Sequence, residues 1–384
     1  MSVKPDVVIA GGGVAGLALA NALAQRGLRS EVLEKRRAPG EIDRGDVIQD
    51  SILPILHRWD LEEVLGAYGP VQLRLFRMLN ERGQTLFEVD LEQALGRPAR
   101  LTLVTHPDLE RILEQAAVRS GLVSVRRDVS CLDLLLEGGR VAGVRTAEGD
   151  VLAPLTVIAN GSQSTLRDRY FSARDLYEYP VSFYNARIKL IPEYADAGVY
   201  ILGPTGVMVM APLPKGEMRI GIQFRRTADS EGVSPRNLRQ VIAKRLEAFP
   251  VDRLEFLDGH VYRLSKSLSR SLAIPGAALV GDAAHTVHPV GGQGMNLAFQ
   301  DAELLAELVE PAKGSPDLLD EACRLYSGQR RRQVERVLRL THAMGLLGAL
   351  EEPALIRIRE ALIRLCNHSA WIKRLAVRRV INVG

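Results

Sequence analysis

The feature that most constrains this chain is a glycine-rich turn near its N-terminus, Gly11-x-Gly13-x-x-Gly16. A short apolar run rich in Val and Ile, residues 6–10, precedes the turn, and a helical pattern of apolar residues follows it. A second strand is predicted at residues 29–33. This β-turn-α-β order is typical of parallel sheets that carry helices on their faces.

The turn also has the arrangement of a dinucleotide-binding site. Gly11 permits the tight turn, Gly13 lets a pyrophosphate approach backbone N–H groups, and Gly16 lets the helix pack on the strand. The helix N-terminus then stabilises the phosphate charge. Glu34 closes the second strand, where its carboxylate can accept hydrogen bonds from a ribose diol. Taken alone, the motif is also compatible with a structural turn that binds nothing.

A second motif, GDAAHTVHPVGGQGMN at residues 281–296, narrows the dinucleotide to FAD. The predicted strand at residues 277–280 delivers Asp282, whose carboxylate suits a ribityl hydroxyl. The glycines that follow open a predicted helix. Reduced flavin carries negative charge around its N1 and C2 carbonyl, and a helix N-terminus, with about half a positive charge, is a fitting partner for it.

These motifs together resemble those of a known family. They are GGGVAG at residues 11–16 with Glu34, then Arg44-Gly45, then GDAAHTVHPVGGQGMNLAFQDA at residues 281–302. The family is the single-component (group A) FAD-dependent aromatic hydroxylases, which have the para-hydroxybenzoate hydroxylase fold. The last motif is most similar to those of ubiquinone-biosynthesis and alkylquinolone-type hydroxylases.

The resemblance implies a set of FAD-binding residues. The glycine turn would hold the pyrophosphate, Glu34 the adenosine ribose, Asp282 the ribityl chain, and residues 294–296 the pyrimidine edge of the flavin. The complete implied set is Gly11, Gly13, Val14, Ala15, Gly16, Glu34, Lys35, Arg44, Val129, Asp282, Gly292, Gly294, Met295 and Asn296.

Two positions depart from the family pattern, and both concern the electron donor. The family implies NADH or NADPH as a transient reductant. It usually has Asp-Gly after the strand before the insertion, where this chain has Asn160-Gly161. A family Arg before the helix around Leu109 is His106 here. Because Asn lacks the charge of Asp, these changes leave the donor open.

The predicted fold class is α/β, with a Rossmann-like FAD-binding domain, an inserted antiparallel β-sheet substrate domain and a helical C-terminal segment. Strand-like runs separated by Pro and Gly turns indicate the insertion, and one helix is expected within it at about residues 237–249. The predicted FAD-binding domain is discontinuous, at residues 1–72, 98–170 and 271–315. The substrate-binding domain is placed at residues 73–97 and 171–270, and the C-terminal segment at residues 316–384.

Candidate substrate and catalytic residues are marked less clearly. Met208 and Met210 lie in an inserted strand, where they either pack in the core or line an apolar pocket. His288 is the candidate catalytic residue, and the alternative is that it holds the turn by hydrogen bonds. The other candidate substrate contacts are Tyr184, Arg187, Gln223 and Pro289.

Cysteine usage and the ends of the chain bear on its setting. Cys131, Cys323 and Cys366 are scattered and have no metal-ligand spacing, so we expect neither disulfides nor a metal site. No signal peptide precedes the first strand, and no apolar run is long enough to span a bilayer. The expected localisation is cytoplasmic.

The C-terminal part of the chain is basic. From Arg324 onward it has 13 Lys or Arg and 4 Asp or Glu, although the whole chain carries only +4. The pattern over residues 354–380 is amphipathic. It is compatible with helices packed on the body, with a solvated face, or with peripheral contact with a membrane. Nucleic acid is not expected, because no nucleic-acid motif appears.

The resemblance implies a monooxygenase that inserts one oxygen atom from O2 through a flavin C4a-hydroperoxide. The expected substrate is small, apolar and aromatic, of quinone-precursor or quinolone type. The alternative is an FAD-dependent reductase or dehydrogenase of an isoprenoid or lipid-like substrate, and a third reading is a flavin-binding protein without turnover. The sequence does not determine an oligomeric state.

Overall fold

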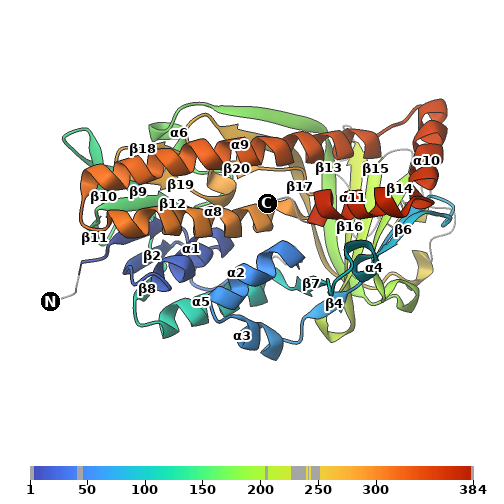
Figure 1. The fold of residues 1–384 in the computed structure, drawn as a ribbon, viewed down its shortest axis with the longest axis horizontal. Helices are drawn as coiled ribbons and strands as arrows, with labels where there is room; N and C mark the ends of the chain where they lie inside the picture. The colour runs from blue at the N-terminus through green and yellow to red at the C-terminus, as the bar shows by residue number, and fades with distance from the viewer. Residues whose placement is uncertain are drawn as a thin grey trace.

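The computed structural model describes residues 4–40, 46–203, 206–225, 239–240, 242–243 and 251–381. Two large sheets follow one another along the long axis of the molecule, and a long C-terminal helix runs past both of them (Figure 1).

The first sheet consists of the apolar runs that the sequence marks as buried strands. Its central strand, β1, pairs in parallel with β2 and β12, and all four residues of β1 are buried. The glycine turn therefore starts at the carboxyl edge of a central strand, where open α/β sheets bind their ligands. In spatial order the strands are β18 (Ala273–Ile274), β19 (Ala277–Leu279), β12 (Leu155–Ile158), β1 (Val7–Ala10), β2 (Ser30–Glu34) and β8 (Val123–Arg127).

Helices α1 (Val14–Ala24), α5 (His106–Arg119) and α8 (Gln293–Val309) pack together beside this sheet. The amide nitrogen of Asn21 on α1 donates to the carbonyl of Leu113 on α5 over 2.8 Å, which ties the two helices together. Shorter helices within the described residues are α2 (Leu53–Arg58), α3 (Glu62–Ala67), α4 (Leu91–Leu95) and α6 (Thr165–Tyr170).

Two smaller sheets have three strands each. One is an antiparallel meander of β9 (Cys131–Glu137), β10 (Arg140–Thr146) and β11 (Gly149–Leu152), whose first turn contains Gly138 and Gly139. The other joins β3 (Asp46–Ile48), β7 (Leu101–Val104) and β4 (Val71–Leu73).

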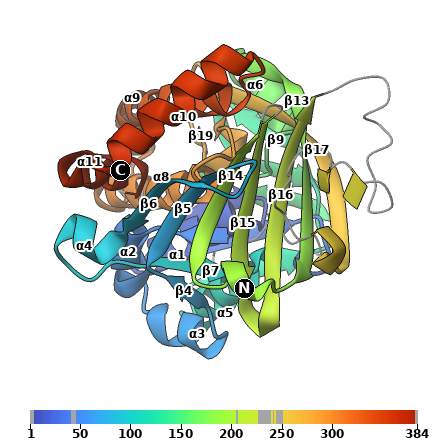
Figure 2. The same ribbon diagram turned by 90° about the vertical axis from the view of Figure 1, so that its right-hand side faces the viewer.

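The second large sheet has eight strands and is antiparallel except where β5 pairs with β14 (Figure 2). Residues 75–90 supply two of its strands, and residues 174–286 supply the other six. Two distant parts of the chain therefore form one sheet. In spatial order the strands are β20 (His285–Thr286), β17 (Phe256–Ser269), β13 (Arg174–Lys189), β16 (Glu217–Arg225), β15 (Gly206–Leu213), β14 (Ala197–Gly203), β5 (Leu75–Asn80) and β6 (Thr85–Asp90).

Three helices end the chain: α9 (Pro316–Gly348), α10 (Pro353–Asn367) and α11 (Ala370–Ile381). Near the start of α9, the Tyr326 hydroxyl donates to the carbonyl of Leu279 on the first sheet over 2.9 Å. Near its end, Gly348 packs closely on Val207 of the second sheet. Helix α10 packs on β6 and α11 on α4, so the last two helices cover one edge of the second sheet (Figure 2).

The predicted fold class is confirmed: a parallel sheet with helices, an antiparallel sheet and C-terminal helices are all present. The predicted helix at residues 237–249 lies largely outside the described residues. Strand β17 was not predicted from the sequence. Among the described residues, none of the helices combines the length and the apolar character that crossing a bilayer requires.

Candidate active site

One large cavity connects the first sheet, the second sheet and the C-terminal helices. Its volume is about 1730 Å³, whereas a pocket for one small ligand usually measures roughly 300–1,000 Å³. Gly11 and Gly13 line one end of the cavity, Asp282 and Gly292 line its middle, and Ile363 on α10 lines the far end. The space suits a dinucleotide together with a second molecule.

The glycine turn at one end of the cavity fits a pyrophosphate. A Cβ atom on Gly11 would lie 2.6 Å from the Ala159 carbonyl oxygen, and one on Gly16 would lie 1.9 Å from the Gly11 carbonyl oxygen. These two glycines are therefore needed for close packing, and Gly16 does not line the cavity. Gly13 does line it and has no heavy atom within 3.7 Å of a built Cβ. Helix α1 starts there without a side-chain cap, so its first N–H groups can bind an anion.

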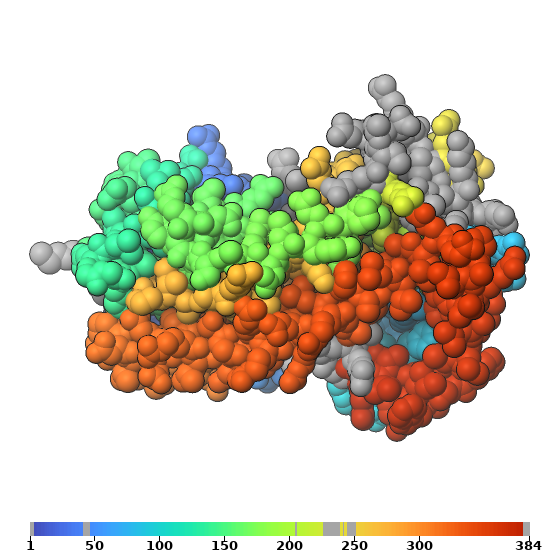
Figure 3. All heavy atoms as spheres, turned by 90° about the horizontal axis from the view of Figure 1, so that it is seen from above, coloured from blue at the N-terminus to red at the C-terminus, as the bar shows by residue number. Residues whose placement is uncertain are grey.

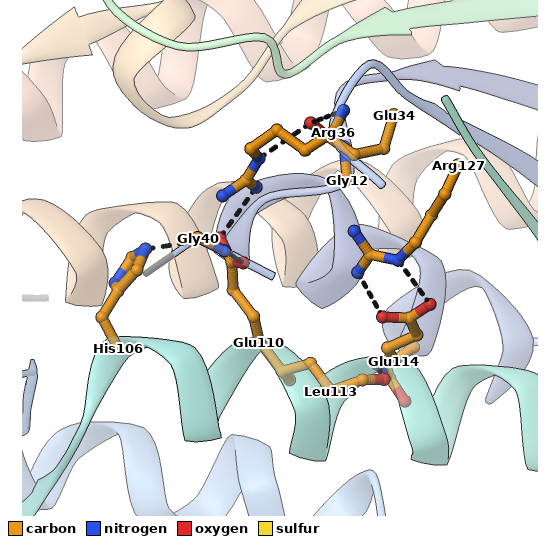
Figure 4. A network of polar contacts seen from close by, with 10 residues as sticks. Gly12, Glu34, Arg36, Gly40, His106, Glu110, Leu113, Glu114 and Arg127 are labelled. Atoms are coloured by element: carbon orange, nitrogen blue, oxygen red, sulfur yellow. Dashed lines mark hydrogen bonds and ion pairs between the residues drawn. The ribbon is translucent and has the colours of Figure 1, made fainter. Parts of the chain in front are cut away.

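Glu34 lies beside the turn, and its carboxylate is already hydrogen-bonded within the chain (Figure 4). Its Oε2 accepts from the Gly12 N–H over 2.6 Å, and its Oε1 accepts from the Arg36 backbone N–H over 3.0 Å and from Arg36 Nε over 2.9 Å. A carboxylate has about four lone-pair positions. Glu34 can therefore still accept from a ribose diol, as the resemblance implies.

Arg36 connects Glu34 to a second buried carboxylate, Glu110 on α5 (Figure 4). Arg36 and His106 approach Glu110 Oε1 within 3.0 and 3.4 Å, and the Gly40 N–H donates to Oε2 over 3.1 Å. Burial alone would raise the pKa of Glu110, but its contacts with His106 and Arg36 outweigh burial and lower the pKa to about 2. His106, which departs from the family pattern, thus helps to keep the Glu110 carboxylate ionised and in place beside the glycine turn.

The other predicted residues at this end are placed as follows. Val14, Ala15, Lys35 and Val129 line the cavity. Arg44 lies outside the described residues. Asn160 and Gly161, which follow β12, also line the cavity, so the departure from the family's Asp-Gly pattern is located beside the glycine turn.

A buried ionic cluster centred on Asp301 of α8 fixes the loop that carries Asp282. Asp301 on α8 accepts from the Gly281 N–H over 2.8 Å, contacts His285 Nε2 at 2.8 Å and accepts from Arg330 Nε over 2.7 Å. Burial would raise the pKa of Asp301, but His285 and Arg330 lower it to about 2. His285 therefore positions the loop, and Asp282 faces the cavity.

The start of α8 forms the middle of the cavity. Gly292 adopts φ 60° and precedes the helix without a side-chain cap, and Gly294 and Met295 line the cavity beside it. Free N–H groups at a helix start suit the negative edge of a reduced flavin. Asn296 does not line the cavity. Its side chain accepts from the Gln49 N–H over 3.0 Å and donates to the carbonyls of Val47 and Gly292, so it holds this turn together.

The candidate catalytic residue, His288, does not line the cavity. Its Nδ1 accepts from the Val290 N–H over 3.2 Å, and its ring packs against Gly345 on α9 and edge-on to Tyr179. Burial, aided by nearby His342, lowers the pKa of His288 to about 4. The position favours the alternative role, in which His288 holds the turn.

The far end of the cavity lies over one face of the second sheet and is largely apolar. Met210 and Pro289, two of the predicted substrate contacts, line the cavity. The apolar lining there also includes Leu73, Phe76, Met78, Val209, Ala211 and Leu213.

Four predicted substrate contacts do not line the cavity. Phe183 lines it, so Tyr184, the next residue along β13, points to the other face of the sheet, with its hydroxyl against Gly259. Met208 packs in the core of the second sheet. Arg187 is paired with Glu217 and Asp258, and Gln223 packs against Gly206.

Tyr200 on β14 is a lining residue that the sequence reasoning missed. Its oxygen accepts from the Gly291 N–H over 3.1 Å, and its ring lies 5.0 Å from that of Phe76. Burial raises the pKa of Tyr200, so the hydroxyl stays protonated. The O–H proton has no acceptor among the described residues and is available to a ligand. The alternation of β14, in which Tyr200 stands between buried Val199 and Ile201, was the available signal.

Comparison with known proteins agrees with this geometry. The family model described as "FAD binding domain" matches residues 4–341. Curated relatives include 3-demethoxyubiquinol 3-hydroxylase of Escherichia coli, 26% identical over 86% of this chain and 85% of that protein. Squalene epoxidase 2 of Arabidopsis thaliana is 28% identical over 81% of this chain, which spans 55% of that protein's length. The chain likewise spans 62% of 6-methylpretetramide 4-monooxygenase of Streptomyces rimosus, with 27% identity.

Solved structures share the whole fold at low sequence identity. The p-nitrophenol 4-monooxygenase of Pseudomonas putida has a TM-score of 0.86 and 20% identity, covering 100% of this chain and 99% of that one. PqsL of P. aeruginosa, solved with 2-aminobenzoylacetate, has a TM-score of 0.80 and 21% identity, covering 94% and 99%. The predicted family is confirmed: this chain belongs to the FAD-binding family of group A flavin-dependent monooxygenases, which have the para-hydroxybenzoate hydroxylase fold.

Proposed function

We propose that this protein is an FAD-dependent monooxygenase that inserts one oxygen atom from O2 into a small, apolar, aromatic substrate of quinone-precursor or quinolone type. The observation that carries the proposal is the continuity of one cavity, from a glycine turn suited to pyrophosphate to an apolar sheet face. Relatives named for a ubiquinol hydroxylation and a structure with bound 2-aminobenzoylacetate support this substrate class.

The FAD would extend from the glycine turn to the start of α8. Gly11 and Gly13 would hold its pyrophosphate, Glu34 its ribose and Asp282 its ribityl chain. When bound, FAD supplies a reduced isoalloxazine ring that reacts with O2, and group A monooxygenases take the electrons for this from NADH or NADPH. One oxygen atom enters the substrate and the other leaves as water.

The chain's own residues would bind, orient and exclude water. The uncapped N–H groups at the start of α8 stabilise negative charge at the ring's pyrimidine edge. The apolar residues of the second sheet keep water away from the reacting centre, which prevents wasteful release of peroxide. Tyr200 would donate its free O–H to a polar group of the substrate and so fix which ring atom faces the flavin.

The predicted domains have matching roles in this proposal. Residues 1–72, 98–170 and 271–315 would bind FAD, and residues 73–97 and 171–270 would bind the substrate. Residues 316–384 would complete the cavity and make peripheral contact with a membrane.

The test is turnover under ¹⁸O₂ with purified holoprotein, NADH or NADPH, and a panel of apolar phenols, quinols and quinolones. We expect at least one ring product that carries a single ¹⁸O atom, together with oxygen uptake. Oxygen uptake that yields only hydrogen peroxide with every compound would contradict the proposal. Turnover without oxygen on an isoprenoid would instead favour the reductase alternative.

A further inference from the structure

The last two helices expose an unusual number of large apolar side chains. Eighteen large hydrophobic residues are exposed among the described residues, and eight of them fall between Leu346 and Leu375. Within α10 and α11 they form a stripe in which Leu365 is 66% and Trp371 70% exposed. The stripe consists of Leu355, Ile358, Leu362, Leu365, Trp371 and Leu375. The spacing of Leu355, Ile358, Leu362 and Leu365 places these four side chains on one face of α10, and a group of exposed apolar side chains of this kind marks an interaction site.

The two helices that carry the apolar stripe are rich in basic residues, of which Arg359 is buried. Residues 353–381 contain seven Lys or Arg and one acidic residue, Glu360. Glu360 is engaged by Arg364, whereas exposed Arg357 and Arg378 have no acidic partner in the part of the chain that the structure describes. An apolar stripe with an exposed Trp and flanking basic residues is the pattern of a helix that lies in the surface of an anionic bilayer.

Charge also indicates whether a second copy of the chain, another protein or a lipid bilayer covers the stripe. A second copy would bring two strongly basic surfaces together, and like charges at a contact are unfavourable. The buried core of a protein interface is usually depleted of charge. Anionic lipid headgroups would neutralise the flanking arginines while the acyl chains receive the stripe.

The same two helices form the far end of the cavity. Leu362 belongs both to the exposed stripe and to the cavity lining, so the cavity reaches the surface there. Figure 3 shows a hollow between α10 and α11, with residues of the β5 and β6 region at its floor. The lining residues from these helices are Leu362, Ile363, Cys366, Ile372, Ala376 and Val377.

We propose that α10 and α11 dock the protein on an anionic bilayer and that its substrate passes from the lipid into the cavity between them. The passage rests on the proposed function, since it requires an apolar substrate. The docking does not, because it depends only on the exposed stripe and the flanking charges.

Docking is tested with the holoprotein by sedimentation with vesicles of phosphatidylcholine alone and with vesicles that contain about one third phosphatidylglycerol. We expect binding to the anionic vesicles that weakens as salt is raised. The double variant Ile358→Glu/Leu365→Glu should lose at least about tenfold in partitioning. The matched control is Leu132→Glu/Leu136→Glu on β9, which changes two equally exposed leucines far from the stripe and should bind like the wild type.

Fluorescence gives a second readout of docking. The chain has two tryptophans, and Trp59 is buried whereas Trp371 is exposed. Anionic vesicles should shift the emission of Trp371 to shorter wavelength, and the shift should vanish in Trp371→Phe. FAD content and melting temperature of each variant show whether it has folded.

Three results would overturn docking: no binding of the wild type to anionic vesicles, equal binding of the stripe variant, or a wild-type dimer that the stripe variant makes monomeric. None of these measurements requires turnover, so docking can be tested even if the proposed function is wrong. The passage is tested by turnover of a substrate dissolved in vesicles and in detergent. The stripe variant should turn over more slowly than the wild type when the substrate is in vesicles, but at the same rate when it is in detergent. If variant and wild type had equal rates in both media, the passage would be refuted.

Discussion

The two ends of the cavity are built in different ways. The FAD end depends on backbone positions that only glycine allows and on buried ion clusters around Glu110 and Asp301. The substrate end is a surface of mainly apolar side chains carried by strands of the second sheet. A single change at the FAD end should therefore disturb folding or cofactor binding, whereas one at the substrate end should change only what is bound and how it is oriented.

The strongest test of this difference is the Asp301→Asn variant at the FAD end. It leaves the buried guanidinium of Arg330 without its carboxylate, and losing one partner of a buried pair costs about 3–5 kcal/mol. We expect a comparable loss in the free energy of unfolding, measured by denaturant titration, together with loss of FAD. The control Glu307→Gln, exposed on the same helix, should change stability by under about 0.5 kcal/mol. A mild effect at Asp301 would remove the contrast between the two ends.

The next test separates cofactor binding from folding. The backbone of Gly13 is extended, with φ −79°, so Gly13→Val should leave folding intact. The added methyl groups would occupy the space for the pyrophosphate, and we expect FAD affinity to fall at least about tenfold, or 1.4 kcal/mol. Quenching of FAD fluorescence measures this, with Gly66→Ala, which meets nothing within 4 Å, as the control. Unchanged affinity would place the pyrophosphate elsewhere.

His288 tests the junction between the two ends through pH. Its pKa is lowered from 6.5 to about 4 in the folded protein. As pH falls, the unfolded chain is therefore protonated at this histidine before the folded protein is, which favours unfolding. Its contribution to stability is thus complete above pH 6.5 and is lost as pH falls toward 4. By pH 4.5 the loss should be about 2.5 kcal/mol. Denaturant titrations from pH 7.5 to 4.5 should show a flatter profile for His288→Gln than for the exposed control His57→Gln, and parallel profiles would refute this.

The smallest effect is expected at the substrate end. Tyr200→Phe removes two neutral hydrogen bonds, the one accepted from the Gly291 N–H and the proposed one to the substrate, each worth about 1 kcal/mol, without leaving a buried charge. We expect kcat/KM to fall about fivefold and peroxide release to rise, with FAD content unchanged and stability lowered by only about 1 kcal/mol. Tyr68→Phe, remote from the cavity, is the control. If Tyr200→Phe instead lost FAD, the two ends would not be independent.

Much of the FAD end could be predicted from the sequence because its residues are fixed by local chain geometry. Gly11, Gly16 and Asp282 sit at set distances from a strand and a helix, and the structure places them in that relation. The cluster of Asp301 with His285 and Arg330 was not predicted, because Arg330 comes from a helix whose packing partner the sequence does not specify.

The substrate end was predicted less well, for two physical reasons. A shift of one residue turns a strand side chain to the other face of the sheet, which is why Tyr184 was chosen although Phe183 lines the cavity. Strand β17 was missed because Asp258, His260 and Lys266 interrupt its apolar residues. It is held by pairing with β13 rather than by an apolar sequence of its own.

Helix α9 joins the two regions at a set spacing. Its 33 residues extend about 50 Å at 1.5 Å per residue, and the part from Tyr326, against the first sheet, to Gly348, against the second, spans about 33 Å. One residue inserted between these contacts would advance the later part of the helix by about 1.5 Å and rotate it by about 100°. Length changes should thus be excluded from this helix, while the loops around the cavity remain free to vary.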